Sequence, residues 1–380
     1  ESAQTFPPPA LPALPAPSPR LIGAPADAHS GPPADARSGA PADARSEPPA
    51  DAHSGPLPGA RSGLPWDARS GARPTGRRVT RRVAALVALL PILGLAACGI
   101  QRPTPGPGQI VAVGAESQYA DVIAQLGRPY VKVAAILANP NSDPHGFEAS
   151  PSVAATVAEA KLVVQNGLGY DSFISRVEAA TPQPGRVVVD VQHLLGLPDS
   201  TANPHLWYAP ATMPRVATAV AAALERLLRR HRDRFRANLA RFTASLRPWW
   251  AQIAAFRARH HGVVVATTEP VADALLSALG LVNATPFAFQ ADVMNGTDPA
   301  PQAVSVEDGL LSHRHVRVFV YNRQVSDSLT QSFLALARAH GIPVVGVDEI
   351  QPPGLSYQAW MEGTVSALSR AVRASGSGPT

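Results

Sequence analysis

Residues 211–262 decide the fold, and they read ATMPRVATAVAAALERLLRRHRDRFRANLARFTASLRPWWAQIAAFRARHHG. Helical periodicity runs through this stretch, and only Pro214 and Pro248 interrupt it. Its second half, roughly residues 232–259, predicts one long helix with a single apolar stripe. The stripe consists of Phe235, Leu239, Phe242, Leu246 and either Trp249 or Trp250. Such a helix divides the chain into a part before it and a part after it.

Both parts have the same alternating pattern. Short β-branched runs begin at residues 110, 131, 161 and 186 before the helix, and at residues 262, 315 and 342 after it. Ala-rich helical stretches lie between these runs. Strands that alternate with helices are typical of a parallel sheet that is covered on both faces. The sequence therefore predicts an α/β protein with two parallel-sheet lobes, at residues 109–231 and 261–374, joined by a linking helix at residues 232–260.

Residues 1–76 differ from the rest of the chain. They are rich in Pro, Ala and Gly, and six eight-residue units run from Gly23 to Ser70. Such composition cannot bury enough apolar surface to offset the loss of chain entropy, which predicts a disordered segment. Because a secretory signal follows this segment instead of preceding it, we interpret residues 1–76 as the product of a start site placed too far upstream.

Residues 77–98 have the pattern of a bacterial lipoprotein signal. Four arginines precede a short apolar run, which ends in the small residues LAAC at 95–98. This run is too short for a comfortable transmembrane helix. LAAC resembles a lipobox, in which the cysteine is lipidated and becomes the new N-terminus, so we expect lipidation at Cys98. The alternative is a small apolar residue in a signal or membrane helix. Residues 99–108 then predict a Pro/Gly tether.

Charge and cysteine content argue against one class of function and exclude one kind of stabilising bond. After Cys98 the chain has 23 Lys and Arg against 21 Asp and Glu, so the basic excess lies mostly upstream. Nucleic-acid binding is therefore not predicted. Cys98 is the single cysteine, which excludes an intrachain disulfide and leaves the fold to depend on its own core.

Four polar residues follow predicted strands, at the ends where functional groups of doubly wound sheets gather. His145 lies in NPNSDPHGFEASP after the run at 131, and His205 lies in NPHLWYAP after the run at 186. Glu269 closes VVVATTE, and Glu349 closes PVVGVDE. Two imidazoles and two carboxylates, two from each lobe, would suit a divalent transition metal ion.

Each of the four also has an ordinary structural interpretation. The histidines follow prolines, as turn residues do; Glu269 precedes Pro270 near a helix start; Glu349 could be an exposed strand end. Spacing does not decide between these readings, because the four lie far apart in the sequence. Arrangements for nucleophilic catalysis, a Gly-rich phosphate loop and a His-Glu-x-x-His motif are not apparent in the sequence.

A family resemblance adds to this pattern. NSDPHGFEASPSVAATVAEAKLVVQNGLGYDSFI resembles the motif region of the metal-binding lipoproteins of zinc and manganese ABC importers, with Asp-Pro-His, Phe-Glu, a Pro-Ser helix start and NGLG at a strand end. NPHLWYAPATMPRVA resembles the second signature of that family. TTEPVADALLSALG and GIPVVGVDEIQPPGLSYQAWM resemble its third and fourth ligand regions. The resemblance covers residues 109–373.

The resemblance implies a fold, a ligand set and a function. The fold is two parallel α/β lobes joined by one long rigid helix. The metal ligands are His145, His205, Glu269 and Glu349, with Asp348 as a substitute for the last. Zinc-type members usually have histidine at the third position, whereas glutamate resembles manganese-type members. Because sites with such ligands often bind zinc tightly as well, the resemblance implies zinc or manganese as the metal.

The implied activity is metal capture, not catalysis, because four protein ligands leave little room for a water nucleophile. The implied partners are an ABC permease and its ATPase. The protein would be a monomer held by its lipid at the outer face of the cytoplasmic membrane, at the cell surface or in the periplasm. Two alternatives remain at this stage, an adhesin or surface interaction protein of the same fold and a metal-dependent enzyme.

Overall fold

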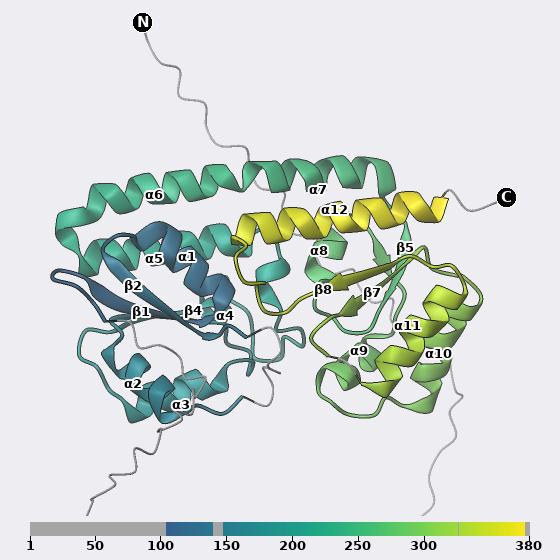
Figure 1. Cartoon of the computed structure of the whole chain (residues 1–380), viewed down its shortest axis with the longest axis horizontal. Coiled ribbons are helices and arrows are strands. Elements are labelled where there is room, and N and C mark those ends of the chain that lie inside the picture. The colour runs from purple at the N-terminus through teal and green to yellow at the C-terminus, as the bar shows by residue number, and fades with distance from the viewer. Residues whose placement is uncertain (1–103, 140–146, 326, 377–380) are drawn as a thin grey trace, which may run out of the picture. The chain divides into compact units, whose positions relative to one another are not determined.

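A computed structural model describes residues 104–139, 147–325 and 327–376 (Figure 1). The predictions for the repeat, the signal segment, Cys98 and His145 fall outside these residues. Within the described ranges, we find no helix with the length and apolar character needed to span a membrane.

Two four-stranded parallel sheets form the framework, which confirms the predicted fold class. The first has the order β2-β1-β3-β4 and the second β6-β5-β7-β8. In the first sheet the strands are β1 Ile110–Glu116, β2 Val131–Leu137, β3 Leu162–Gln165 and β4 Val187–Asp190. In the second they are β5 Val264–Thr267, β6 Val282–Asn283, β7 Val318–Asn322 and β8 Val344–Val347. The two-residue β6 was not predicted, because it is too short to carry a β-branched run.

Both sheets have the same topological switch point. In each sheet the second strand lies on one side of the first strand and the third strand lies on the other side. The strand order therefore reverses between β1 and β3 in one sheet and between β5 and β7 in the other. Ligands of open α/β sheets bind outside the carboxyl ends of the strands at such a point. The residues that end β5 and β7 therefore lie where a ligand is expected.

Helices cover the sheets (Figure 1). The first lobe has α1 Ser117–Gly127, α2 Pro151–Glu159, α3 Ser172–Ala180, α4 Val191–Leu195, the 3₁₀ turn η1 Leu206–Tyr208 and α5 Thr212–Leu227. The second has α8 Asp273–Ala278, α9 Phe287–Met294, α10 Pro301–Ser312 and α11 Ser328–Ala339. Valine, isoleucine and leucine side chains of the sheets form cores with the inner faces of these helices.

The linking segment is two helices in sequence, not one. After the 3₁₀ turn η2 Arg229–His231 come α6 Arg232–Ser245 and α7 Arg247–His260, which meet at Leu246. Pro248 has no N–H to donate to the carbonyl four residues earlier, which explains the interruption of the predicted single helix. The helix resumes at once, since the Trp250 N–H donates to the Leu246 carbonyl at 3.1 Å. Most of the predicted apolar stripe is buried, Leu239 is partly buried, and Trp249 rather than Trp250 completes the stripe.

The last helix, α12 Tyr357–Gly376, joins the two lobes a second time. It follows β8, yet its first residue donates its backbone N–H to the carboxylate of Asp121 on α1 at 2.8 Å. The Tyr357 hydroxyl donates to the carbonyl of Trp207 at 2.6 Å, and its ring lies edge-on to Trp249 of α7. The segment between β8 and α12 is thus attached to the first lobe at Tyr357, where α12 begins.

Candidate metal centre

His205 lies between Pro204 and η1, and its side chain is buried. Its Nδ1 is 2.8 Å from Oδ1 of Asn203, whose own amide nitrogen donates to the Pro270 carbonyl at 2.8 Å. The Asn203 amide is therefore oriented with its oxygen toward the imidazole. An acceptor at Nδ1 holds the ring proton there and leaves a lone pair on Nε2. Nε2 is buried and has no hydrogen-bond partner among the described residues, as expected of a ligand atom.

Glu349 faces this nitrogen. It follows β8, is 0% exposed, and places Oε2 3.7 Å from Nε2 of His205. The Tyr170 hydroxyl donates to the same Oε2 at 2.9 Å. An ion with bonds of about 2.1 Å to both atoms spans such a gap at a bond angle of roughly 120°. The pair is therefore compatible in distance and in chemistry with a shared divalent ion.

Glu269 follows β5 and is 4% exposed. One side-chain nitrogen, Nδ2 of Asn322, donates to Glu269 Oε2 at 3.3 Å and to Glu349 Oε1 at 2.5 Å. The two carboxylates thus flank a single amide at the switch point of the second sheet. Two buried carboxylates that share one amide donor would repel each other when both are ionised, and a divalent cation would compensate both charges.

Side chains of the turn after β7 form hydrogen bonds and an ion pair with the turn after β8. Gln324 Oε1 accepts the backbone N–H groups of Glu349 at 2.5 Å and Ile350 at 2.8 Å. Arg323 binds both oxygens of Asp348, with Nε donating to Oδ1 at 2.8 Å. This bidentate ion pair engages the carboxylate that the sequence left as a substitute ligand. The geometry therefore favours Glu349 over Asp348.

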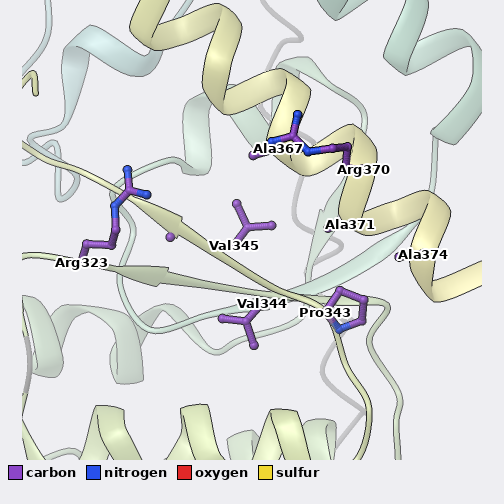
Figure 2. Close-up of a pocket in the computed structure, with 9 residues that line it drawn as sticks. Arg323, Pro343, Val344, Val345, Ala367, Arg370, Ala371 and Ala374 are labelled. Carbon is purple, nitrogen blue, oxygen red and sulfur yellow. The ribbon is translucent and has the colours of Figure 1, made fainter. Parts of the chain in front are cut away.

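Arg323 also borders a surface groove of about 340 Å³ between β8 and α12, which Figure 2 shows in close-up. The three described candidate ligands do not line this groove. Its other residues are Pro343, Val344, Val345, Gly346, Ala367, Arg370, Ala371 and Ala374. The groove is thus separate from the pair formed by His205 and Glu349.

A tight turn after β3 positions Tyr170. Asp171 accepts the backbone N–H groups of Asn166 at 2.5 Å and Gly167 at 3.0 Å. Burial raises the pKa of Asp171 to about 6, although these backbone donors act in the opposite direction. Gly167 has a φ of 82°, in the left-handed region that favours glycine. The NGLG sequence therefore builds the turn that directs the tyrosine hydroxyl at Glu349.

The structure brings some of the predicted ligands together. His205 and Glu349 face each other directly, and Glu269 is linked to Glu349 through Asn322. His145 lies outside the described residues. Within the described part of the chain, no three His, Cys, Asp or Glu side chains converge closely enough to hold an ion.

The sequence did not predict the residues that contact the candidate ligands, namely Asn203, Tyr170, Asn322 and Gln324. A signal for Asn322 was present, because it ends β7 just as the candidate ligands follow their strands. No comparable signal marked Tyr170, which is 179 residues from Glu349 in the sequence.

Known structures share this fold. The periplasmic zinc binding protein TroA from Treponema pallidum superposes with a TM-score of 0.59 at 16% identity, covering 70% of this chain and 99% of that one. The solute-binding protein FpvC from Pseudomonas aeruginosa, in complex with Mn²⁺, gives a TM-score of 0.59 at 19% identity over the same shares. A Mn-bound periplasmic metal binding protein (S38A mutant) from Candidatus Liberibacter asiaticus gives 0.56 at 15% identity, covering 70% of this chain and all of that one.

Sequence comparison adds a relative and a family. A putative metal-binding protein from Thermotoga maritima is 37% identical over 75 residues, which is 20% of this chain and 26% of that protein. The chain thus spans about a quarter of that curated relative. The profile of the family described as zinc-uptake complex component A, periplasmic, matches residues 113–371. This match extends from β1 to α12, through both lobes and the linking helices, so the chain belongs to the zinc-uptake complex component A family.

Proposed function

We propose that this protein is an extracytoplasmic solute-binding lipoprotein that captures a divalent transition metal ion, zinc or manganese, and delivers it to an ABC permease. The observation that carries the proposal is the buried pair of His205 Nε2 and Glu349 Oε2, 3.7 Å apart. The Nδ1 contact with Asn203 leaves a lone pair on the nitrogen, and the carboxylate supplies negative charge.

The proposed ligand set is His145, His205, Glu269 and Glu349. Two neutral imidazoles and two carboxylates balance the charge of one divalent ion. Imidazole suits zinc and related ions, whereas carboxylates move a site toward manganese. With this fold, TroA is a zinc binding protein, and the structure of FpvC is a complex with Mn²⁺. Both metals therefore enter the proposal.

Transport fits this site better than catalysis does. Four protein ligands would enclose the ion and leave no position for a reacting water. The family is described as periplasmic component A of a zinc-uptake complex, which supports a binding role in import. We therefore assign the permease and ATPase as partners of a monomeric binding protein.

Metal titration tests the binding step. Zinc and manganese are titrated separately into the purified protein in competition with a chelating indicator. The wild type should bind one ion, and His205→Ala should bind at least about 100-fold more weakly, beyond the loss typical of a supporting residue. His193→Ala is the matched control, because that histidine lies in the same lobe with a side chain 79% exposed. Equal loss in both variants would contradict the assigned site.

Transport and anchoring need tests in cells. Deletion of the gene should reduce accumulation of zinc or manganese, whereas an adhesin would leave accumulation unchanged. Palmitate labelling should mark the wild type and not Cys98→Ser. Equal labelling of both would remove Cys98 as the anchor and leave the binding proposal intact.

A further inference from the structure

A cluster of basic side chains lies where α5 turns into α6, at the same end of the first lobe as the start of β2 (Figure 1). Six exposed arginines occur between residues 226 and 236, and two more exposed cations, Arg128 and Lys132, flank the start of β2. The ring of Tyr130 stacks on that of His231 with 3.6 Å between their centroids, which joins the two segments. We call this surface the basic corner, and its charged residues are Arg128, Lys132, Glu225, Arg226, Arg229, Arg230, Arg232, Asp233, Arg234 and Arg236.

The basic corner concentrates the positive charge of the chain. It holds eight of the 23 Lys and Arg that follow Cys98, and two of the 21 Asp and Glu, for a formal net charge of +6. The other residues after Cys98 have 15 cations against 19 anions, a net charge of −4. Both carboxylates of the corner pair with one cation, since the Arg236 guanidinium lies 3.1 Å from Glu225 and 3.7 Å from Asp233. The other seven cations have no ion-pair partner among the residues that the structure describes.

The chain enters the folded body beside this corner. Gln109 immediately precedes β1 and donates its Nε2 to the Pro129 carbonyl at 2.6 Å, and the Ile110 N–H donates to the Tyr130 carbonyl at 3.2 Å. A surface hollow of about 430 Å³ at this edge is lined by Gln109, Arg128, Pro129, Val131, Lys132 and Val133. Cys98 precedes Gln109 by eleven residues, which span at most about 40 Å when fully extended. The basic corner therefore stays close to the proposed lipid anchor.

This closeness to the anchor points to the chemistry of the partner. Anionic phospholipids give a bilayer a negative surface potential, which attracts Lys and Arg within about 8 Å at physiological salt. A short tether keeps the corner at a high local concentration over the bilayer, so that weak contacts become occupied. Single-stranded nucleic acid suits the corner less well, because it is bound through bases that stack on aromatic rings. The rings of the corner are already engaged, since Tyr130 stacks on His231 and Phe235 is buried.

We propose that the basic corner binds the anionic phospholipid headgroups of the membrane that carries the anchor, so that the first lobe lies against the bilayer. This inference rests on the lipid anchor of the proposed function. The corner lies at the amino ends of β1 and β2, whereas the candidate metal ligands follow the carboxyl ends of strands. Contact with the membrane should therefore leave metal affinity unchanged.

The test uses the lipidated protein, purified from membranes and reconstituted into vesicles. Ala237→Cys, at an exposed position of α6 next to Arg236, carries a fluorophore that nitroxide-labelled lipid headgroups quench on contact. We expect quenching in vesicles of phosphatidylcholine with phosphatidylglycerol and none in phosphatidylcholine alone. Salt at about 1 M should abolish it, because the Debye length is then about 3 Å. Ala258→Cys, at an exposed position of α7, is the positional control and should stay unquenched.

Charge variants of the labelled protein measure the contribution of the arginines. Arg229→Gln combined with Arg234→Gln removes two cations of the corner. The ratio of membrane-bound to free first lobes should fall about fivefold for each cation removed, and so about 25-fold in total. Arg247→Gln combined with Arg259→Gln is the matched control, because it removes the same charge from exposed positions of α7. This control should keep the ratio of the unaltered protein.

The remaining outcomes overturn the inference. They are equal quenching with and without phosphatidylglycerol, quenching that persists at high salt, equal losses in the two pairs of variants, and binding of added RNA without any quenching by the vesicles. Absence of quenching in a protein that incorporates palmitate overturns this inference and leaves the anchor and metal capture intact. A protein that incorporates no palmitate overturns the anchor and this inference together, whereas metal titration still tests capture by itself.

Discussion

His205 and Glu349 face each other across 3.7 Å, yet the two lobes support them in different ways. On the side of the first lobe, one acceptor, Asn203 Oδ1, contacts the imidazole, and the rings of Tyr170 and Trp207 lie edge-on to it at 5.9 and 5.5 Å. On the side of the second lobe, Asn322 binds both carboxylates and Gln324 binds the backbone that carries Glu349. The support for the carboxylates is therefore mostly polar, whereas that for the imidazole is mostly aromatic.

The difference follows from charge. A neutral imidazole needs one hydrogen bond to fix its tautomer, and apolar rings can then fix its plane without a desolvation penalty. A buried carboxylate needs several donors, since each unpaired oxygen is costly. A site that joins the two kinds of ligand should lose metal for different reasons when one side or the other is altered.

Removal of a proposed carboxylate ligand should have the largest effect. Glu349→Ala eliminates a carboxylate that faces His205, and we expect metal affinity to fall by at least about 1,000-fold, more than for any supporting residue. Competition with a chelating indicator measures it. Glu159→Ala, at an exposed position of the first lobe, is the control. An effect of less than about tenfold would show that Glu349 is not a ligand.

Removal of the acceptor behind the imidazole should have a smaller effect. Asn203→Ala removes the hydrogen-bond acceptor of His205 Nδ1 and so allows the tautomer with the proton on Nε2. Metal affinity should therefore fall by about 10- to 100-fold. Asn203→Asp retains an acceptor at the same position and should recover most of this loss. If both variants bind metal equally weakly, the residue acts through the fold of its loop and not through the tautomer.

Glu307 offers a contrast within the second lobe, because it is fully buried on α10 outside the candidate site. Burial raises its pKa from 4.5 to about 8, which the Thr285 hydroxyl offsets only in part. Between these values the unfolded state is ionised while the folded state keeps the proton. The free energy of unfolding should therefore decrease as the pH rises from about 4.5 to 8, by up to about 1.4 kcal/mol per pH unit.

Urea unfolding at several pH values between 5 and 8 measures this slope. Glu307→Gln carries no titrating group and should show a shallower slope than the wild type. Identical slopes in the two proteins would mean that Glu307 is ionised in the folded state.

The ion pair beside the site should have the smallest effect. The side chain of Arg323 is 51% exposed, and exposed ion pairs contribute about 1 kcal/mol or less to stability. Arg323→Ala should lower the free energy of unfolding by no more than that, and metal affinity should change by less than about tenfold, because Gln324 still holds the backbone of Glu349. Gain of a second bound ion through the released Asp348 carboxylate would contradict the assignment of that residue.

Much of the fold could be predicted from the sequence, because the relevant patterns are local. The β-branched runs correspond to seven of the eight strands in the described part of the chain, and the exception, β6, has only two residues. The linking helix was predicted as continuous across Pro248, although the missing N–H of a proline argues for a break. The buried residues of the apolar stripe pack on both sides of the break, and α7 follows α6 after the single residue Leu246.

The candidate site was predictable only for residues that follow a strand. His205, Glu269 and Glu349 could be named because the carboxyl ends of parallel strands gather polar ligands. Their supporting residues come together through contacts between distant segments, such as Tyr170 with Glu349 and Asn322 with Glu269, which are 53 residues apart. No spacing rule connects such pairs, so only the folded chain reveals them.

The most direct test of the central claim is the position of a bound ion. Crystals of the protein loaded with zinc, measured at the zinc absorption edge, locate the metal by its anomalous scattering. We expect one peak about 2.0–2.2 Å from both Nε2 of His205 and Oε2 of Glu349. A peak elsewhere, with these two atoms left unbound, would contradict the account.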